Sequence, residues 1–340
     1  MALPQWLGDL PPVFVAPMAG GPSKPELVTA AARAGFLAQL AGGYTSAAAL
    51  AEQLAAVRDA GVESFGVNLF VPNPVPVDRR EYDAYRRSLL PEAERFGVEL
   101  PGEPVEDDDA WAEKLELLIA SPVPLVSFTF GLPAPRDIAA LRASGAVTAQ
   151  TVTTADEARA AAEAGVDALV LQGFGAGGHS GVWDPRRAPR AVALDAVLAE
   201  VRAAVALPVI AAGGVGSAAR AGELLQAGAE AVSVGTAVLR SPESGASAVH
   251  KAALADERYE GTQLTRAFSG RLARGLRNRF VIDHSEAAPL GYPAVHHLTR
   301  PLRSASAAAG DPAAVALWAG VEYRSASDAP VAQTLAELVP

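Results

Sequence analysis

The chain has no cysteine, which excludes disulfides, thiol catalysis and cysteine-ligated zinc or iron–sulfur clusters. Basic side chains are few: 28 Lys and Arg against 38 Asp and Glu give a formal net charge of −10. Nucleic-acid binders normally show a basic face, so this balance argues against that class. Apolar stretches are interrupted by charged residues before they reach the roughly 20 residues that cross a bilayer, and no secretory signal precedes them. These absences predict a soluble, cytoplasmic protein that binds neither nucleic acid nor membrane.

The chain alternates short apolar runs with alanine-rich amphipathic stretches. The apolar runs lack polar alternation, which is typical of parallel strands buried on both faces. They span residues 13–18, 36–41, 65–71, 124–130, 146–152, 168–173, 208–214 and 231–239. Thr154 and Ser217 stand where helix N-caps are expected, and Gly165 and Gly228 stand where helices should end. Eight strands, each followed by a helix or helical excursion, predict an α/β fold, the TIM (β/α)8 barrel.

Two segments are longer than a minimal barrel needs. Residues 72–122, after the third strand, contain two polar stretches that predict an inserted pair of helices on the outside of the barrel. Their acidic run Asp107–Asp109 favours a helix N-terminus over a metal site, and no spaced ligand set predicts a metal. Residues 256–310, after the eighth strand, are basic and rich in glycine, which favours a lid or flap. We therefore expect one barrel domain from 1–255 with 311–340, and a lid from 256–310.

The carboxyl ends of the strands are where such a barrel holds its active site. Gly213-Gly214 after the seventh strand and Gly235-Thr236 after the eighth are typical of phosphate-binding turns, in which backbone N–H groups bind an anion. The amides of Asn68 and Gln172 both donate and accept hydrogen bonds, which suits the edge of an isoalloxazine ring. Glycines at strand ends also permit tight turns without any ligand, but two adjacent turns favour a phosphate. FMN is the predicted cofactor.

His179 lies in the glycine-rich stretch QGFGAGGHSG, residues 172–181, directly after the sixth strand. Glycines there would let the backbone pass close to the cofactor while the imidazole reaches the substrate. An ordinary histidine pKa near 6.5 would suit a base, or a group that holds an anion when charged. The alternative is a histidine that hydrogen-bonds the loop to itself. The remaining histidines are expected to be solvated or structural: His250, His284, His296 and His297.

Several short motifs, which follow one another along the chain, resemble those of the FMN-dependent nitronate monooxygenases, formerly called 2-nitropropane dioxygenases. The matching stretches are APMAGGPSKPEL (16–27), GGYTS (42–46), QGFGAGGHSG, PVIAAGGV (208–215), TRAFSGRLARGLRN (265–278) and LWAG (317–320). The resemblance implies oxidation of an alkyl nitronate, such as propionate 3-nitronate, by O₂ through the flavin. A small anionic nitronate or nitroalkane and O₂ would be the substrates, and a carbonyl compound with nitrite or nitrate would be the products.

The resemblance also implies site residues. His179 would be catalytic, and FMN would contact residues at the strand ends: Met18, Asn68, Gln172, Gly177, Gly178, Gly213, Gly214, Ser233, Val234, Gly235 and Thr236. The chain departs from the family pattern where Gly175 replaces a glutamate, beside His179, and where Thr129 replaces a histidine. The arginines of the stretch 265–278 would provide charge over an anionic substrate or the phosphate, or would pair with the acidic barrel surface: Arg266, Arg271, Arg274 and Arg277.

Two other functions fit the same sequence. An NAD(P)H-dependent FMN reductase of quinones or enoyl thioesters needs no dinucleotide glycine fingerprint if NADH binds at the flavin face. A non-catalytic barrel that binds a phosphate ligand would keep the phosphate turns without the flavin, although Asn68 and Gln172 argue against it. No pattern in the sequence predicts an oligomeric state.

Overall fold

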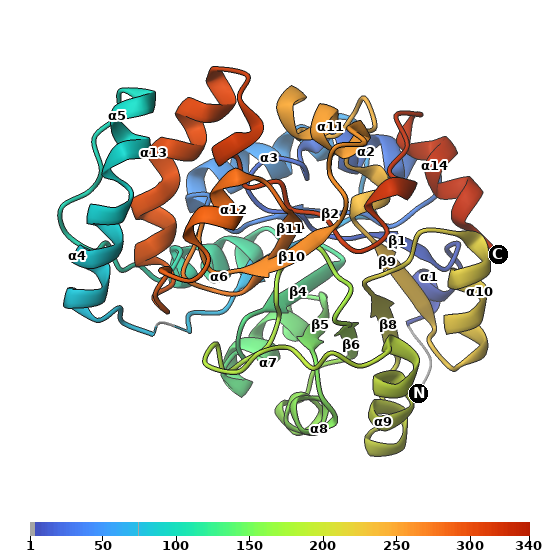
Figure 1. Ribbon diagram of the computed structural model, residues 1–340. Coiled ribbons are helices and arrows are strands. Elements are labelled where there is room, and N and C mark those ends of the chain that lie inside the picture. Colours follow the sequence, from blue (N-terminus) through green and yellow to red (C-terminus); the bar gives the residue numbers. More distant parts are fainter. Residues whose placement is uncertain (1–3, 74) are drawn as a thin grey trace.

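Eight parallel strands form one sheet that curls into a barrel in the computed structural model, which describes residues 4–73 and 75–340 (Figure 1). The strands are β1 (Val13–Val15), β2 (Gln39–Ala41), β3 (Gly66–Phe70), β4 (Leu125–Thr129), β5 (Val147–Val152), β6 (Ala168–Gln172), β8 (Val209–Ala212) and β9 (Ala231–Val234). The sheet order is β1-β9-β8-β6-β5-β4-β3-β2. The N–H of Val15 donates to the carbonyl of Leu37 at 2.8 Å, so the first strand meets the chain just before β2. The predicted α/β barrel and its eight strands are confirmed.

The strands are buried because both of their faces are covered. Side chains that point into the barrel pack with Leu7 of the short helix α1 (Gln5–Gly8), among them Phe14, Leu125 and Ile210. Side chains on the other face pack against the surrounding helices in the largest apolar cluster of the described residues. This double burial is the reason that the strands appear in the sequence as unbroken apolar runs.

The connecting helices pack around the barrel. They are α2 (Pro25–Arg33), α3 (Ala47–Asp59), α6 (Trp111–Ala120), α7 (Pro135–Ala143), α8 (Ala155–Ala164), α9 (Leu194–Ala204), α10 (Ala218–Gln226), the 3-10 helix η1 (Thr236–Val238), α11 (Ala248–Ala255) and α14 (Val331–Leu338). Thr154 and Ser217 cap α8 and α10 as predicted, since each side chain accepts a backbone N–H of the first turn. Gly165 ends α8 in the left-handed conformation, with φ +90°. The C-terminal helix α14 returns to the barrel and packs on α2 and α10.

The insertion after β3 serves two parts of the molecule. Helix α6 packs beside β3 on the barrel, as predicted. The first predicted helix is two helices, α4 (Arg79–Ser88) and α5 (Leu90–Phe96), which are separated at Leu89. Pro91 is the second residue of α5. They lie beside α13 (Ala294–Ala308) at one end of the molecule (Figure 1). The shared core, called here the side cluster, contains Tyr82, Tyr85, Leu89, Ala93, Leu100, Ala267, Phe268, Phe280, Val281, Ala294, Val295, Leu298, Leu302 and Ala314.

The segment after α11 reaches back over the barrel. Its strands β10 (Thr262–Thr265) and β11 (Ala273–Leu276) form an antiparallel sheet with β7 (Gly178–His179), which belongs to the glycine-rich loop. Ala273 of β11 pairs with His179. The remaining elements are α12 (Arg279–His284) and the 3-10 helices η2 (Pro312–Ala314) and η3 (Tyr323–Ser325). The division of the chain into a barrel and a lid of residues 256–310 stays a prediction.

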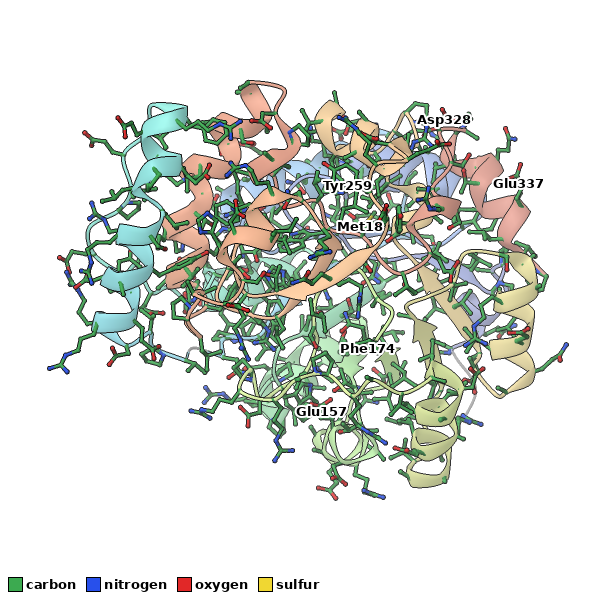
Figure 2. The ribbon with its side chains drawn as sticks, viewed as in Figure 1. Met18, Glu157, Phe174, Tyr259, Asp328 and Glu337 are labelled. Atoms are coloured by element: carbon green, nitrogen blue, oxygen red, sulfur yellow. The ribbon has the colours of Figure 1, made fainter. Side chains whose placement is uncertain are left out.

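Side chains divide between the interior and the surface as this arrangement requires. Met18 lies toward the middle of the molecule, whereas Asp328 and Glu337 lie at its periphery (Figure 2). Within residues 4–73 and 75–340, no helix combines the length and apolar character that a membrane span needs.

Candidate active site

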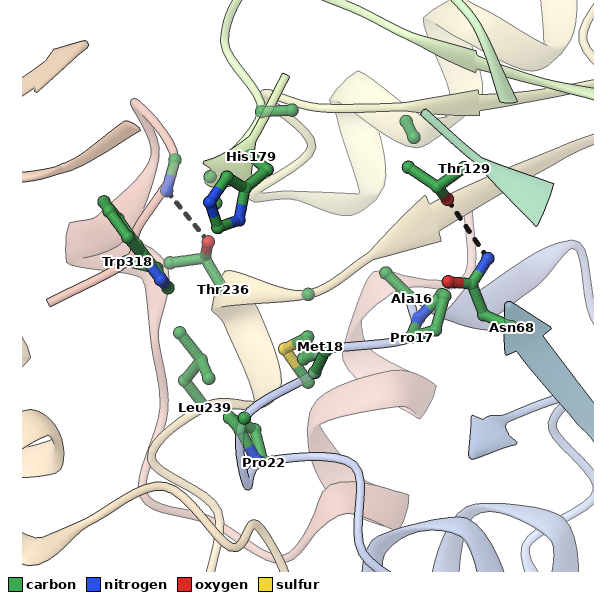
Figure 3. A pocket seen from close by; sticks show the side chains of 18 of the residues that line it. Ala16, Pro17, Met18, Pro22, Asn68, Thr129, His179, Thr236, Leu239 and Trp318 are labelled. Atoms are coloured by element: carbon green, nitrogen blue, oxygen red, sulfur yellow. Dashed lines mark hydrogen bonds between the residues drawn. The ribbon is translucent and has the colours of Figure 1, made fainter. Parts of the chain in front are cut away.

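A cavity with a volume of about 460 Å³ opens inside the barrel and extends past the carboxyl ends of its strands. Each strand contributes lining residues, including Phe14, Gln39, Asn68, Ser127, Thr151, Gln172, Ala212 and Ser233. Small-molecule sites usually measure about 300–1,000 Å³, so the cavity has the size of a cofactor or substrate site. It is lined by His179 and by every residue predicted to contact the cofactor: Met18, Asn68, Gln172, Gly177, Gly178, Gly213, Gly214, Ser233, Val234, Gly235 and Thr236. Figure 3 shows several of them around one opening.

One end of the cavity is built from backbone. Gly213 and Gly214 have φ values of +101° and +72°, which side chains rarely adopt. A Cβ at Gly213 would lie only 2.8 Å from the Cβ of Ala176, so the two loops meet there without room for a side chain. Gly235 is the N-cap residue of η1, so this helix also begins with bare backbone. This end therefore presents main chain, the surface that binds phosphate groups in such barrels.

The C-terminal segment closes this end. A Cβ at Gly177 would lie 2.5 Å from the nitrogen of Gly320, so only glycine allows this approach. The N–H of Gly320 donates to Thr236 Oγ1 at 3.0 Å. Position 175 also faces this segment, because a Cβ there would lie 2.9 Å from Val321 Cγ2 and 3.6 Å from the backbone of Gly214. A side chain at 175 would thus begin at the glycine turn and the C-terminal segment. The sequence had instead suggested that a side chain at position 175 would lie beside His179.

The two predicted amide residues have different surroundings. Asn68 Nδ2 donates to Ser127 Oγ at 2.9 Å and to Thr129 Oγ1 at 3.1 Å, the second bond being dashed in Figure 3. Its carbonyl oxygen is left as an acceptor. Gln172 instead uses both ends of its amide on the glycine-rich loop. Its Nε2 donates to the carbonyl of His179 at 3.1 Å, and its Oε1 accepts from the N–H of Gly181 at 2.7 Å. Asn68 thus offers an acceptor, whereas Gln172 chiefly holds the loop of His179.

His179 lies in an aromatic enclosure. Its ring centroid is 5.7 Å from that of Phe130, 5.9 Å from that of Tyr292 and 5.4 Å from that of Trp318. Burial, together with the nearby cations Arg271 and Arg303, lowers the pKa of His179 to about 3. The expectation of a pKa near 6.5 is therefore wrong, because removal from water disfavours the charged imidazole. At neutral pH the ring is uncharged.

Hydrogen bonds around Ser269 assign the tautomer of this ring. His179 Nε2 lies 2.8 Å from Ser269 Oγ. The Ser269 hydroxyl donates to the carbonyl of Arg271 at 3.1 Å, so its oxygen is free to accept from Nε2–H. The network therefore places the proton on Nε2 and leaves Nδ1 with a lone pair that can accept a proton.

The arginines of residues 265–278 hold loops together. Arg271 is only 2% exposed; its Nε donates to the carbonyl of Ser180 at 3.2 Å, and its guanidinium lies 4.1 Å over the ring of Phe130. Arg274 Nε donates to the carbonyl of Phe174 at 3.2 Å, and Arg277 is exposed. None of the four lines the cavity or forms an ion pair within the described residues: Arg266, Arg271, Arg274 and Arg277. Neither role expected of them from the sequence is seen.

The acidic run of the insertion lies directly before α6, as predicted, but it also makes contacts that the sequence did not predict. Helix α6 begins after Ala110 without a side-chain cap. The Asp109 carboxylate pairs with the buried Lys114 at 2.8 Å and accepts the N–H of Tyr44 at 2.9 Å. Asp107 lies 2.6 Å from His297 on α13. The run therefore ties the insertion to two other segments, and no group of three potential metal ligands occurs in the described residues.

Sequence reasoning missed most of the aromatic wall of the cavity. Tyr44 stacks on His296, with ring centroids 4.1 Å apart and planes 4° apart. His296 was expected to be solvated or structural, but it lines the cavity, as do Trp318 and Arg303. His250 also lines it and is structural, since its Nε2 lies 3.0 Å from the carbonyl of Trp318. Apart from the short stretches GGYTS and LWAG, no sequence pattern marks this wall.

The comparisons with known proteins agree on one family. A model of the nitronate monooxygenase family matches residues 6–340. A probable nitronate monooxygenase from Staphylococcus aureus (strain Newman) is 33% identical over 340 residues, which cover 99% of this chain and 96% of the relative.

Solved structures show the same arrangement. A nitroalkane oxidase from Streptomyces ansochromogenes superposes with a TM-score of 0.92 at 43% identity, over 98% of this chain and 95% of that one. FabK from Thermotoga maritima superposes with a TM-score of 0.76 at 23% identity, over 98% and 93% of the two chains. The second likeness concerns the fold alone.

Proposed function

The chain belongs to the nitronate monooxygenase family, and from this premise we propose that it oxidises alkyl nitronates with O₂ on bound FMN. Family membership makes the chain a flavin-dependent oxidoreductase and removes the alternative of a non-catalytic phosphate-binding barrel. The proposed products are a carbonyl compound and nitrite or nitrate. One nitronate and one O₂ balance to one carbonyl and one nitrate; two nitronates and one O₂ balance to two carbonyls and two nitrites.

The observation that carries this proposal is the composition of the cavity. Backbone turns at Gly213-Gly214 and Gly235-Thr236 suit a phosphate, and the free acceptor of Asn68 suits the N–H edge of a flavin ring. The donors and the glycine cradle therefore fit FMN. When bound, FMN supplies the redox chemistry, taking electrons from the substrate and passing them to O₂.

His179 would act on the substrate as a neutral imidazole. Its Nδ1 carries the lone pair that would accept the α-proton of a neutral nitroalkane, while Ser269 holds Nε2. A preformed nitronate has already lost that proton. The negative charge that forms as the nitroalkane loses its proton would raise the low pKa of the imidazole and favour the transfer.

The wall around His179 would exclude water from the reacting group. Phe130, Tyr292 and Trp318 surround the ring, and Arg271 holds Ser180 and Val182 behind it. A dry site strengthens electrostatic interactions with an anionic substrate and protects reactive species from side reactions.

The test begins with the purified flavoprotein. We expect FMN, rather than FAD, to be released on denaturation. Anaerobic addition of propionate 3-nitronate should reduce the flavin, and addition with O₂ should consume oxygen, much faster than NADH or NADPH reduces the flavin. Rapid anaerobic bleaching by NADH without nitronate-dependent oxygen consumption would replace this proposal with the NAD(P)H-dependent reductase.

A further inference from the structure

An anionic substrate needs a positive charge, and the proposed function leaves open which residue provides it. His179 is neutral at neutral pH, since burial lowers its pKa to about 3. Arg271 and Arg274 donate to main-chain carbonyls, and Arg277 is exposed away from the cavity. The cavity lining contains two fully charged side chains, Arg303 and the exposed Glu322. Among the described residues that line the cavity, Arg303 is therefore the one fixed positive charge.

Arg303 is held in place by its own helix. On α13, its Nε lies 3.2 Å from Thr299 Oγ1, and its Nη2 donates to the carbonyl of His296 at 2.9 Å. No carboxylate pairs with it within residues 4–73 and 75–340. A guanidinium carries five N–H groups, and the Nη1 pair has no acceptor among the described residues. The half-buried side chain thus borders the cavity with unused donors.

The environment of Arg303 favours an incoming anion. Burial lowers the pKa of Arg303 to about 10, so it stays charged at neutral pH while it is poorly solvated. Charge-assisted hydrogen bonds from arginine to oxyanions are strong and geometrically specific. A partly desolvated cation without a counter-ion gains more from such a partner than a solvated one does.

The position of Arg303 separates it from the proton-accepting ring. Tyr292 contacts both His179, at 5.9 Å between centroids, and His296, at 6.4 Å. His296 in turn contacts Arg303, with 3.3 Å between Nδ1 and Nη2. Tyr292 and His296 thus lie between Arg303 and His179, although the Arg303 charge is near enough to lower the pKa of the ring.

We propose that Arg303 binds an oxyanion of the substrate and is the residue that makes the enzyme prefer anionic to neutral substrates. This inference rests on the proposed function for its substrate. The oxyanion is either the nitronate group or a carboxylate elsewhere in the same molecule. Two nitronates, one with a carboxylate and one without, distinguish these sources.

The experiment compares Arg303→Met with the matched control Arg300→Met in the flavin-loaded protein. Arg300 is exposed on the same helix and does not line the cavity, so both variants lose one positive charge from α13. In Arg303→Met we expect the KM of propionate 3-nitronate to rise about 10- to 100-fold. The change in kcat should be smaller, the KM of neutral nitroethane should not change, and Arg300→Met should resemble the wild type. If ethyl nitronate suffers equally, the nitronate group is the oxyanion bound; if only propionate 3-nitronate suffers, it is the carboxylate.

A binding measurement separates this inference from the proposed function. Acetate, which does not react, is titrated into each holoprotein, and the visible flavin spectrum reports its dissociation constant. We expect weaker acetate binding in Arg303→Met only, whether or not nitronates turn over. Unchanged acetate affinity and nitronate KM in Arg303→Met, or equal losses in the Arg300→Met control, would overturn the assignment. If Arg303→Met does not fold, Arg303→Gln is judged by the same outcomes.

Discussion

The two ends of the cavity are built in opposite ways. At the glycine end, Gly213, Gly214 and Gly235 present backbone that follows directly from two neighbouring strands. At the aromatic end, the wall is formed by side chains from segments far apart in sequence, such as Tyr44, His296 and Trp318. The glycine end is thus a property of local turns, whereas the aromatic end exists only when segments distant in sequence are packed together.

This difference has a functional meaning. Backbone binding surfaces tolerate few changes, because a side chain fills the space or demands another φ value, as a Cβ at Gly213 would. Side-chain walls tolerate substitution more easily and therefore adjust which substrate is accepted. We expect the glycine end to govern cofactor retention and the aromatic end to govern substrate choice and rate.

The largest effect is expected from Gly214→Asp. A Cβ there meets only Val321 Cγ2 at 3.7 Å, so the change is chiefly one of charge and conformation. Aspartate would repel the phosphate, and FMN should be lost during purification. Gly214→Asn is the matched control, because asparagine has the same shape without the charge and tolerates positive φ. Fluorescence titration of the apoprotein with FMN measures both; equal affinities in the two variants would place the phosphate elsewhere.

The next effect concerns the aromatic end and leaves the cofactor bound. His179→Asn should lower kcat/KM for neutral nitroalkanes by about 10²–10⁴-fold, the usual loss when a general base is removed. Preformed nitronates should lose much less, because they have no proton to transfer. Steady-state oxygen consumption with nitroethane and with ethyl nitronate makes the comparison. Equal losses on both forms would mean that the ring binds substrate or supports the loop.

A smaller effect is expected on stability, through His250 behind Trp318. Burial lowers the pKa of His250 to about 4, so between about pH 4 and 6.5 the unfolded chain binds a proton that the folded chain does not. The contribution of His250 to the free energy of unfolding is therefore fully present above pH 6.5, and it is lost as the pH decreases. At pH 5 this histidine should account for about 2 kcal/mol of the loss. Urea unfolding at pH 7 and pH 5 should show a smaller decrease for His250→Gln; the same decrease in both proteins would contradict the assignment.

The smallest effect is expected from Ser269→Ala. The variant removes the partner of His179 Nε2 and leaves the aromatic enclosure intact. One hydrogen bond contributes about 1 kcal/mol, so kcat/KM for neutral nitroalkanes should fall about 5-fold. Loss of the fixed tautomer is the physical reason, and nitronate oxidation serves as the internal control. An unchanged rate with nitroethane would show that Ser269 does not orient the ring.

The barrel was predictable because its signals are local. Eight unbroken apolar runs, helix caps at Thr154 and Ser217, and glycines at strand ends each specify a conformation within a few residues. The glycine turns were predictable for the same reason. The break between α4 and α5 was not, although Pro91 lies just after it. Their place in the side cluster also escaped prediction, because it joins Tyr85 to Ala267 across 182 residues.

The positions of the strands along the chain, the residue types at their ends and the family motifs could all be read from the sequence. The sequence also determined that the predicted cofactor residues would share one cavity, because parallel strands place their carboxyl ends together. The charge state of His179 depends on the packed structure, since burial lowers its pKa to about 3. The packed structure also directs Arg271 to the main-chain carbonyl of Ser180, whereas Arg303 lines the cavity. Desolvation and partner choice depend on segments distant in sequence, and no local pattern encodes them.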